Sequence, residues 1–238
     1  MALACANVAA ASFASTTGGD PVSIPSHTTV TDSLYTFAVV SSINDATVVS
    51  VTLPGTGTEV ILDERIRTTL LVVTVGYMLC TSGGTGTGSI DLAASSTGCC
   101  FVLDEWTGID LADPVIDANF IDGDGTDASA PTDVSITLPS ALAKSTNAIW
   151  GCYGFNSNAV VTPGTDYTET FDAGHNSPTR RIFTQYDISP PDLVFDAQLA
   201  SAAAQWAGIA FEVNEASAAA SSLIYPPSAT QTYPLRNL

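Results

Sequence analysis

Short runs of apolar and β-branched residues recur along the chain, with Gly, Pro, Asn, Asp or Ser between them. This pattern predicts the strands of an all-β fold, an antiparallel β-sandwich of jelly-roll-like type. The run at residues 66–79 is nearly continuously apolar, which is typical of a strand buried on both faces. The predicted strands cover residues 34–40, 47–53, 66–79, 89–93, 99–106, 134–138, 148–155, 182–186, 193–199 and 205–213.

Helix signals are scarce. Residues 197–204 and 216–220 have helical propensity, but neither segment has an amphipathic stripe or good capping residues. The glycine-rich segment 82–88 (SGGTGTG) predicts a flexible loop tip. No internal repeat of fixed period is visible, so we expect one sandwich domain over residues 31–215.

Two segments are expected outside this sandwich. Residues 1–30 are rich in Ala, Ser, Thr, Gly and Pro and predict an N-terminal arm, and residues 216–238 predict an extended, Pro-rich tail. A tail of this kind can bind a partner chain through its large apolar side chains. The predicted partner-binding residues are Leu223, Ile224, Tyr225, Tyr233 and Leu235.

The chain is strongly acidic and moderately apolar. Among its 238 residues, 24 are Asp or Glu and 6 are Lys or Arg, which gives a net charge of -18. This balance argues against nucleic-acid binding, because phosphate contacts need clustered Lys and Arg. No apolar run approaches the ~18 residues of a membrane span, and the N-terminus lacks the basic region of a signal peptide. We therefore expect no membrane partner and synthesis without export.

The five cysteines show no metal-site spacing, because no Cys-x-x-Cys pair or Cys/His cluster is present. Neighbouring positions on a strand face opposite sides, so Cys99 and Cys100 predict one buried and one exposed thiol. Buried, reduced cysteines are the favoured interpretation. A disulfide between subunits remains the alternative.

One acidic segment suggests a cation site. Asp122 and Asp124 stand at alternate positions, as the ligands of calcium loops do. Counted from Asp122, Asp127 is the sixth position and Asp133 the twelfth. However, the sixth position is not Gly and the twelfth is not Glu, and Asp-Gly pairs are also common in hairpin turns. The turn interpretation is favoured, so no metal and no cofactor are predicted.

Catalytic motifs are absent from the sequence. The histidines His27 and His175 lie in loop-like contexts, and no nucleophile elbow or phosphate-binding loop is present. The carboxylate pairs Asp104–Glu105 and Asp110–Asp113 could suggest glycoside hydrolysis, but no aromatic cleft accompanies them. The tryptophans at 106, 150 and 206 adjoin apolar runs and are expected in the core. We therefore predict a protein that is not an enzyme.

Three stretches resemble a family of bacteriophage and prophage β-sandwich proteins. They are the opening MALA with a small-residue arm and the strand LYTFAVV, the segment WTGIDLADPVIDANFIDGDGTDASAPTDVSITLP at 106–139, and QWAGIAFEV at 205–213. The likeness spans about residues 30–213, and its motifs are short. The Pro-rich C-terminal extension and the five cysteines depart from the family.

This resemblance implies a jelly-roll-like module of the virion surface: a capsid decoration, head fibre or tail accessory protein with no catalytic residues. The expected partners are the major capsid or tail protein and further copies of the chain, with assembly in the host cytoplasm. The alternative is a fibre or tail module that binds a carbohydrate or a host receptor. An exposed row of aromatic residues near Tyr153, Tyr167 or Tyr186 would favour that alternative.

Overall fold

The computed structural model describes residues 2–13, 21–42, 47–67, 71–124, 132–176, 179–188, 190, 193–201 and 205–217. Within these ranges the regular structure is sixteen β-strands without any α-helix, which confirms the predicted all-β class. None of the described segments forms a helix long and apolar enough to cross a membrane.

The strands divide into two consecutive sets of eight. The first set is β1 (Ala4–Phe13), β2 (Val22–Thr29), β3 (Leu34–Ser41), β4 (Val48–Thr52), β5 (Thr56–Arg67), β6 (Leu71–Ser82), β7 (Gly84–Leu92) and β8 (Cys99–Thr107). The second set is β9 (Val115–Asp124), β10 (Asp133–Thr137), β11 (Ala148–Phe155), β12 (Val161–Pro163), β13 (Thr168–Asn176), β14 (Thr179–Ile188), β15 (Val194–Leu199) and β16 (Gln205–Val213).

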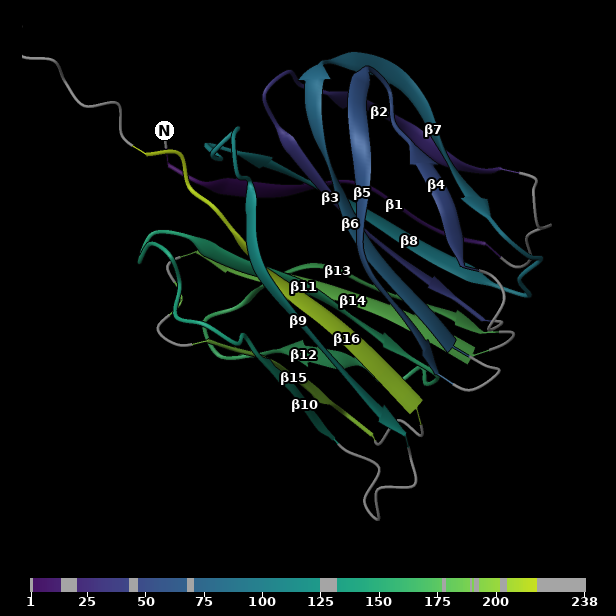
Figure 1. The fold of residues 1–238 in the computed structure, drawn as a ribbon. Coiled ribbons are helices and arrows are strands. Elements are labelled where there is room, and N and C mark those ends of the chain that lie inside the picture. Colours follow the sequence, from purple (N-terminus) through teal and green to yellow (C-terminus); the bar gives the residue numbers. More distant parts are fainter. Residues whose placement is uncertain are drawn as a thin grey trace, which may run out of the picture.

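Each set folds into one sandwich of two antiparallel sheets. The first sandwich has sheets β1-β8-β3-β6-β5 and β2-β7-β4, and the second has β13-β14-β11-β16-β9 and β10-β15-β12. The placement of β1, β8, β3 and β6 opposite β2, β7 and β4 is the strand order of a jelly roll, built from two Greek keys. One difference is that β5 pairs with β6 instead of β4. Figure 1 shows the two sandwiches stacked, with the five-stranded sheets facing each other.

The second sandwich repeats the topology of the first. Adding eight to each strand number of the first sandwich reproduces both sheets of the second. The contacts between the facing sheets follow the same rule: β1 lies on β13 as β9 lies on β5, and β3 lies on β14 as β11 lies on β6. The two sandwiches are therefore related by an approximate twofold axis, as the subunits of an isologous dimer are.

The register of the strands reveals traces of this repeat in the sequence. The tripeptide Val-Ser-Ile occurs in β2 at 22–24, paired with β7, and again in the equivalent strand β10 at 134–136, paired with β15. The turn from β4 to β5 reads PGTGTE at 54–59, and the equivalent turn from β12 to β13 reads PGTDYTE at 163–169. The bulges of β5 and β13 also fall opposite the same point of their partner strands. The repeat was not recognised from the sequence because these matches are three to six residues long.

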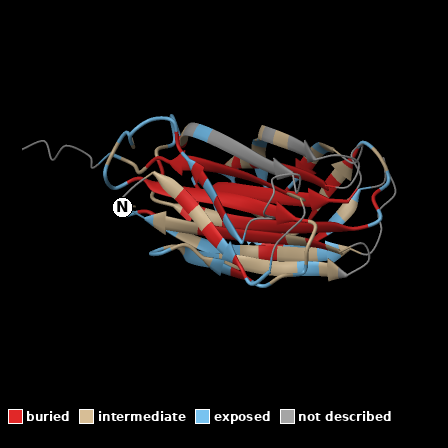
Figure 2. Cartoon of the chain, turned by 90° about the horizontal axis from the view of Figure 1, so that it is seen from below, coloured by how far each residue is buried: buried red, intermediate tan, exposed pale blue. Residues whose placement is uncertain are grey.

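Three apolar cores stabilise the four layers. One lies within each sandwich, and the third fills the space between the two five-stranded sheets. Because both faces of these central sheets are covered, β3 and β11 are buried at every position. Figure 2 shows this burial concentrated on the central strands, with exposed residues on the outer elements. Burial at about 25 cal/mol per Å² of apolar surface makes such strands the main source of stability.

Several sequence-based expectations need correction. The segment 1–30 contains β1 and β2, which pair with β8 and β7, so its described residues belong to the sheets and do not form an arm. The expected single sandwich over 31–215 is two sandwiches, because strands that are apolar on both faces need a covering layer on each side. The apolar run 66–79 belongs to two strands, β5 and β6. At residues 197–199, where the predicted strand 193–199 overlapped a segment of helical propensity, the structure has the strand β15.

The glycine-rich segment 82–88 is also not a loose tip, since β7 begins at Gly84. A β-carbon on Gly88 would lie 2.5 Å from the carbonyl oxygen of Thr52, and one on Gly84 would lie 2.7 Å from the amide nitrogen of Gly55. These glycines allow neighbouring backbones to approach closely, which is a common reason for Gly within a strand.

Candidate functional site

A buried carboxylate joins the two sandwiches. Asp104 on β8 accepts hydrogen bonds from Trp150 Nε1 on β11 at 2.7 Å, from Thr170 Oγ1 on β13 at 2.8 Å and from Asn7 Nδ2 on β1 at 2.9 Å. The side chain of Asp104 is fully buried. One charged group in the interface is thus held by donors from both sandwiches.

Strand alternation and two bulges explain this arrangement. Alternation places Asp104 on the same face of β8 as Val102 and Trp106, toward the second sandwich. The ladder of β1 shifts at Val8, next to Asn7, and that of β13 shifts at Thr170 itself. Bulges re-aim side chains, and both of these lie where donors are needed.

The buried position of Asp104 affects its own pKa and those of neighbouring thiols. Burial raises the pKa of Asp104, and the hydrogen bonds from Trp150, Asn7 and Thr170 oppose this rise. Burial also raises the pKa of the thiols of Cys5 and Cys152, and the nearby carboxylate adds to both shifts. These thiols are therefore poor nucleophiles, and the hydrogen bonds to Asp104 link strands of both sandwiches.

We expect the wild-type chain to gain stability relative to Asp104→Asn as the pH is lowered from 7 toward 4. The raised pKa means that the folded state takes up the proton at higher pH than the unfolded state, whose carboxyl titrates near 4. The free energy of unfolding therefore rises as pH falls through the folded pKa, and levels off below the unfolded value. Urea midpoints of both chains between pH 4 and 8 measure the difference. A difference that does not change with pH contradicts this assignment.

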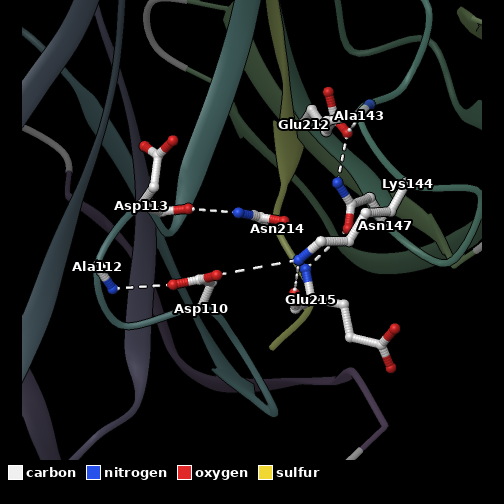
Figure 3. A network of polar contacts seen from close by, with 9 residues as sticks. All are labelled: Asp110, Ala112, Asp113, Ala143, Lys144, Asn147, Glu212, Asn214 and Glu215. Atoms are coloured by element: carbon white, nitrogen blue, oxygen red, sulfur yellow. Dashed lines mark hydrogen bonds and ion pairs between the residues drawn. The ribbon is translucent and has the colours of Figure 1, made fainter. Parts of the chain in front are cut away.

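A second polar network lies where β16 ends (Figure 3). Glu212 on β16 is buried and accepts hydrogen bonds from Asn147 Nδ2 and, at 2.8 Å, from the backbone N–H of Ala143. Asn147 in turn accepts, at 2.8 Å, the backbone N–H of Glu215. The loop before β11 is thereby tied to the segment that leaves the second sandwich.

The linker between the sandwiches completes this network. Ile109 forms an antiparallel bridge with Glu215, and the backbone N–H of Ala216 donates to Gly108 at 2.8 Å. The only lysine of the chain, Lys144, donates to the Glu215 carbonyl and lies 3.9 Å from an oxygen of Asp110. We call residues 108–114 together with 214–217 the exit junction. These contacts tie residues 214–216, which follow β16, to the linker.

An apolar hollow adjoins the exit junction. Its volume is about 280 Å³, and Val60, Tyr77, Leu79, Leu111 and Pro114 line it together with smaller residues. Leu111 is 47% exposed and Val60 is 37% exposed, so two of its walls are open to solvent. We call this hollow the exit groove.

The predicted site residues do not gather in the described structure. Asp122 and Asp124 lie in the last positions of β9, so this part of the acidic segment continues a strand instead of forming the expected turn. Asp127 lies outside the described residues, as do the predicted partner-binding residues Leu223, Ile224, Tyr225, Tyr233 and Leu235. Among the residues that the structure describes, no group of three His, Cys, Asp or Glu side chains is arranged to hold a metal ion.

The carboxylate pairs considered for hydrolysis have separate structural contacts. Asp104 faces the interface, whereas Glu105, on the other face of β8, accepts a hydrogen bond from Tyr35 Oη at 2.8 Å. Asp110 accepts the backbone N–H of Ala112 at 3.0 Å within the linker. Sequence reasoning named these carboxylates but missed their roles, because the donors lie on distant strands.

The aromatic residues are mostly core residues, as expected. Trp106, Trp150 and Trp206 are buried, which confirms their predicted place. Tyr153 is also buried and donates to the carbonyl of Phe195 at 2.6 Å. Tyr167 and Tyr186, the other aromatic positions considered for receptor binding, are half-buried and form edge-on contacts with Phe195 and Trp106. These three tyrosines therefore do not form an exposed row.

All five cysteines are free thiols, and four of them are buried. This agrees with the favoured interpretation, with one correction: Cys99 and Cys100 are both buried. They do face opposite sides of β8, but one side packs into the core of the first sandwich and the other into the interface. Burial raises the pKa of the Cys100 thiol to about 11.

Comparison with known proteins adds no relative. No protein-family model matches the chain, and no significant match was found among curated proteins or solved structures. The all-β part of the resemblance to phage sandwich proteins holds in the structure, and its phage part is therefore taken up as a proposal.

Proposed function

We propose that the chain is a non-enzymatic structural protein of a bacteriophage virion, a capsid decoration or auxiliary head protein that binds and reinforces the shell. The observation that carries this proposal is the pair of jelly rolls packed face to face, with residues 214–216 tied to the linker at the exit junction. Jelly rolls are an architecture of viral capsid proteins. Because a fold alone does not determine function, surface and charge must add support.

The outer sheets provide edges for contacts with neighbours. Within the described residues, the edge strands β4 and β12 each pair on one side only. Val49 on β4 and Val160 next to β12 are both 59% exposed, and they occupy similar places in the two sandwiches. A short open edge with an apolar side chain suits the addition of a partner strand, in which backbone hydrogen bonds supply affinity.

The charge distribution favours the C-terminal segment as the docking element. The whole chain has a net charge of -18, which keeps free copies apart in solution. Residues 218–238 contain no Asp or Glu and one basic residue, Arg236. This segment can therefore approach another acidic copy, or an acidic shell, with the least repulsion.

The buried carboxylates support a structural role. Asp104 and Glu212 each accept hydrogen bonds that tie separate strands or loops together, and both are buried. Such satisfied polar networks rigidify a fold and specify one arrangement of its parts. A rigid double sandwich is what reinforcement of a shell requires.

We expect the change of Leu223, Ile224 and Tyr225 to Ser to leave the chain folded and to lower its occupancy in particles at least tenfold. Each of these side chains gains about 1.5–3 kcal/mol on full burial, and 1.4 kcal/mol is tenfold in binding. Quantitative mass spectrometry of purified particles measures occupancy. The matched control changes Thr230, Gln231 and Thr232 to Ala.

Two results would contradict the proposal. If purified phage particles from a host that makes this chain do not contain it, the virion assignment fails. If the Ser variant is incorporated at the wild-type level, the C-terminal segment is not the docking element.

A hollow on the outer sheet of the second sandwich favours a second candidate, a fibre or tail module that binds a carbohydrate. It lies over β10, β15 and β12, and Asp133, Ser135, Thr162, Asp196 and Gln198 contribute to its lining. Carboxylate, amide and hydroxyl groups are the usual partners of sugar hydroxyls. Saturable binding of an oligosaccharide that is lost in Asp196→Ala would favour this candidate over shell reinforcement.

A further inference from the structure

The described chain ends beside a second hollow that adjoins the exit groove. Ala216 and Ser217 line a hollow with Ile109, Leu111 and Ala112. Leu111 and Ala112 also line the exit groove. The two hollows therefore share part of the linker as a wall, and Ser217, the last described residue, lines the hollow next to the groove.

The length of the following segment fits this path. Leu223 is six residues beyond Ser217, which corresponds to a reach of at most about 20 Å in extended chain. The three residues Leu223-Ile224-Tyr225 are followed by Pro226 and Pro227, which restrict the free chain and lower the entropy lost on docking. A connection of this length also gives a local concentration in the millimolar range.

Composition also favours this segment as the occupant. The groove is lined mainly by apolar side chains, and acidic residues flank it in the sequence, with Glu59 beside Val60 and Asp110 beside Leu111. Acidic segments of the chain would be repelled by these carboxylates, so they are disfavoured as occupants of the groove. Residues 218–238 combine apolar anchors with no acidic residue.

We propose that the exit groove binds the Leu223–Tyr225 segment of the same chain, so that the C-terminal segment lies across β5, β6 and the linker in the free protein. This inference concerns the isolated chain and does not depend on the proposed virion function. The groove supplies an apolar surface that is open to solvent, and the segment supplies the side chains that cover it.

Disulfide trapping tests this proposal in the full chain. Leu111→Cys combined with Ile224→Cys should form an intrachain disulfide in most molecules under mild oxidation, and the monomer should run faster on a non-reducing gel. The matched control pairs Ile224→Cys with Val160→Cys, a position on the second sandwich that is more exposed than Leu111. We expect at least tenfold less cross-linking in this control.

The cross-linked product shows whether the groove binds the segment of the same chain or that of a second copy. Disulfide-linked dimers at Leu111→Cys would show that a second copy's segment occupies the groove, and this overturns the intrachain proposal. Equal cross-linking of both pairs, or none, also overturns it. The experiment uses no virus particle. The proposed virion function can therefore fail while this inference holds, and this inference can fail while the virion function holds.

Hydrogen exchange provides a second measurement on a chain without new cysteines. We expect the amides of Leu223–Tyr225 to exchange at least tenfold more slowly in the wild-type chain than in Leu111→Asp, which places a charge in the groove wall. The amides of β16 serve as the internal reference for folding. Unchanged exchange of 223–225 with β16 intact contradicts docking.

Discussion

Replacing Asp104 with Ala should lower the free energy of unfolding by about 2 kcal/mol. The substitution removes the acceptor of the buried Trp150 Nε1, and such a group costs about 1–3 kcal/mol. Asn7 is exposed, and its Nδ2 keeps the carbonyl of Leu103 as an acceptor at 3.4 Å. Thr170 loses the same acceptor but retains Thr184 Oγ1 at 2.6 Å. Urea unfolding followed by tryptophan fluorescence measures the change, because Trp150 reports directly on this site.

Asp104→Asn is the matched control for this prediction. The amide keeps one acceptor oxygen for Trp150 and Thr170 and removes the buried charge, and Asn7 can turn its own amide to accept from the new N–H. We expect this variant to lose less than about 1 kcal/mol at pH 7. Similar losses for the Ala and Asn variants would mean that the hydrogen bonds to Asp104 contribute little to the interface.

Strands that are apolar on both faces could be predicted from the sequence. The runs at 34–40, 99–106, 148–155 and 205–213 became β3, β8, β11 and β16, the central strands of the two large sheets. Their continuous apolar pattern is a local property, and burial on both sides is its physical cause. That same pattern required more than two layers, which a single sandwich does not supply.

Elements stabilised by their neighbours were harder to predict. The strand β1 consists largely of Ala, Ser and Asn, which have weak strand propensity, and it is held by its ladder with β8. The strand β7 contains three glycines, and adjacent backbones approach closely at two of them, Gly84 and Gly88. These causes lie in tertiary contacts, so no local pattern reports them.

The candidate sites could be predicted only in part. The acidic pair Asp104–Glu105 was visible in the sequence. Because the two residues are adjacent, they suggested a single site. On a strand, however, adjacent side chains point to opposite faces, and Asp104 and Glu105 do so on β8. The repeat was hidden for a related reason. The position equivalent to Asp104 in the second sandwich is Phe211, and the bulge residue equivalent to Thr170 is Leu62. The approximate twofold axis thus relates the polar pair Asp104 and Thr170 to the apolar pair Phe211 and Leu62. Equivalent positions therefore differ in residue type.

Replacing Gly154 with Val should separate the sandwiches locally and lower the free energy of unfolding by about 2 kcal/mol. Gly154 on β11 faces the first sandwich, and a β-carbon there would lie 2.4 Å from Val73 Cγ2 and 3.0 Å from Val40 Cγ2. Overpacking a dense core costs about 1–3 kcal/mol. Replacing Gly also restricts the unfolded chain, which by itself raises the free energy of unfolding by about 0.4–1 kcal/mol. The clash should exceed this gain, because both valines are held in the interface core.

Gly86→Val is the matched control, because the nearest atom to a β-carbon at Gly86 is Pro54 Cγ at 4.0 Å. The same substitution there restricts the unfolded chain without a clash, so we expect no loss of stability and a gain below about 1 kcal/mol. Urea midpoints of the two variants and the wild type give the comparison. The interface core takes side chains from both sandwiches, so Gly154→Val should shift one common transition. A second, separate transition in this variant would show that the sandwiches unfold independently and that the interface does not couple them.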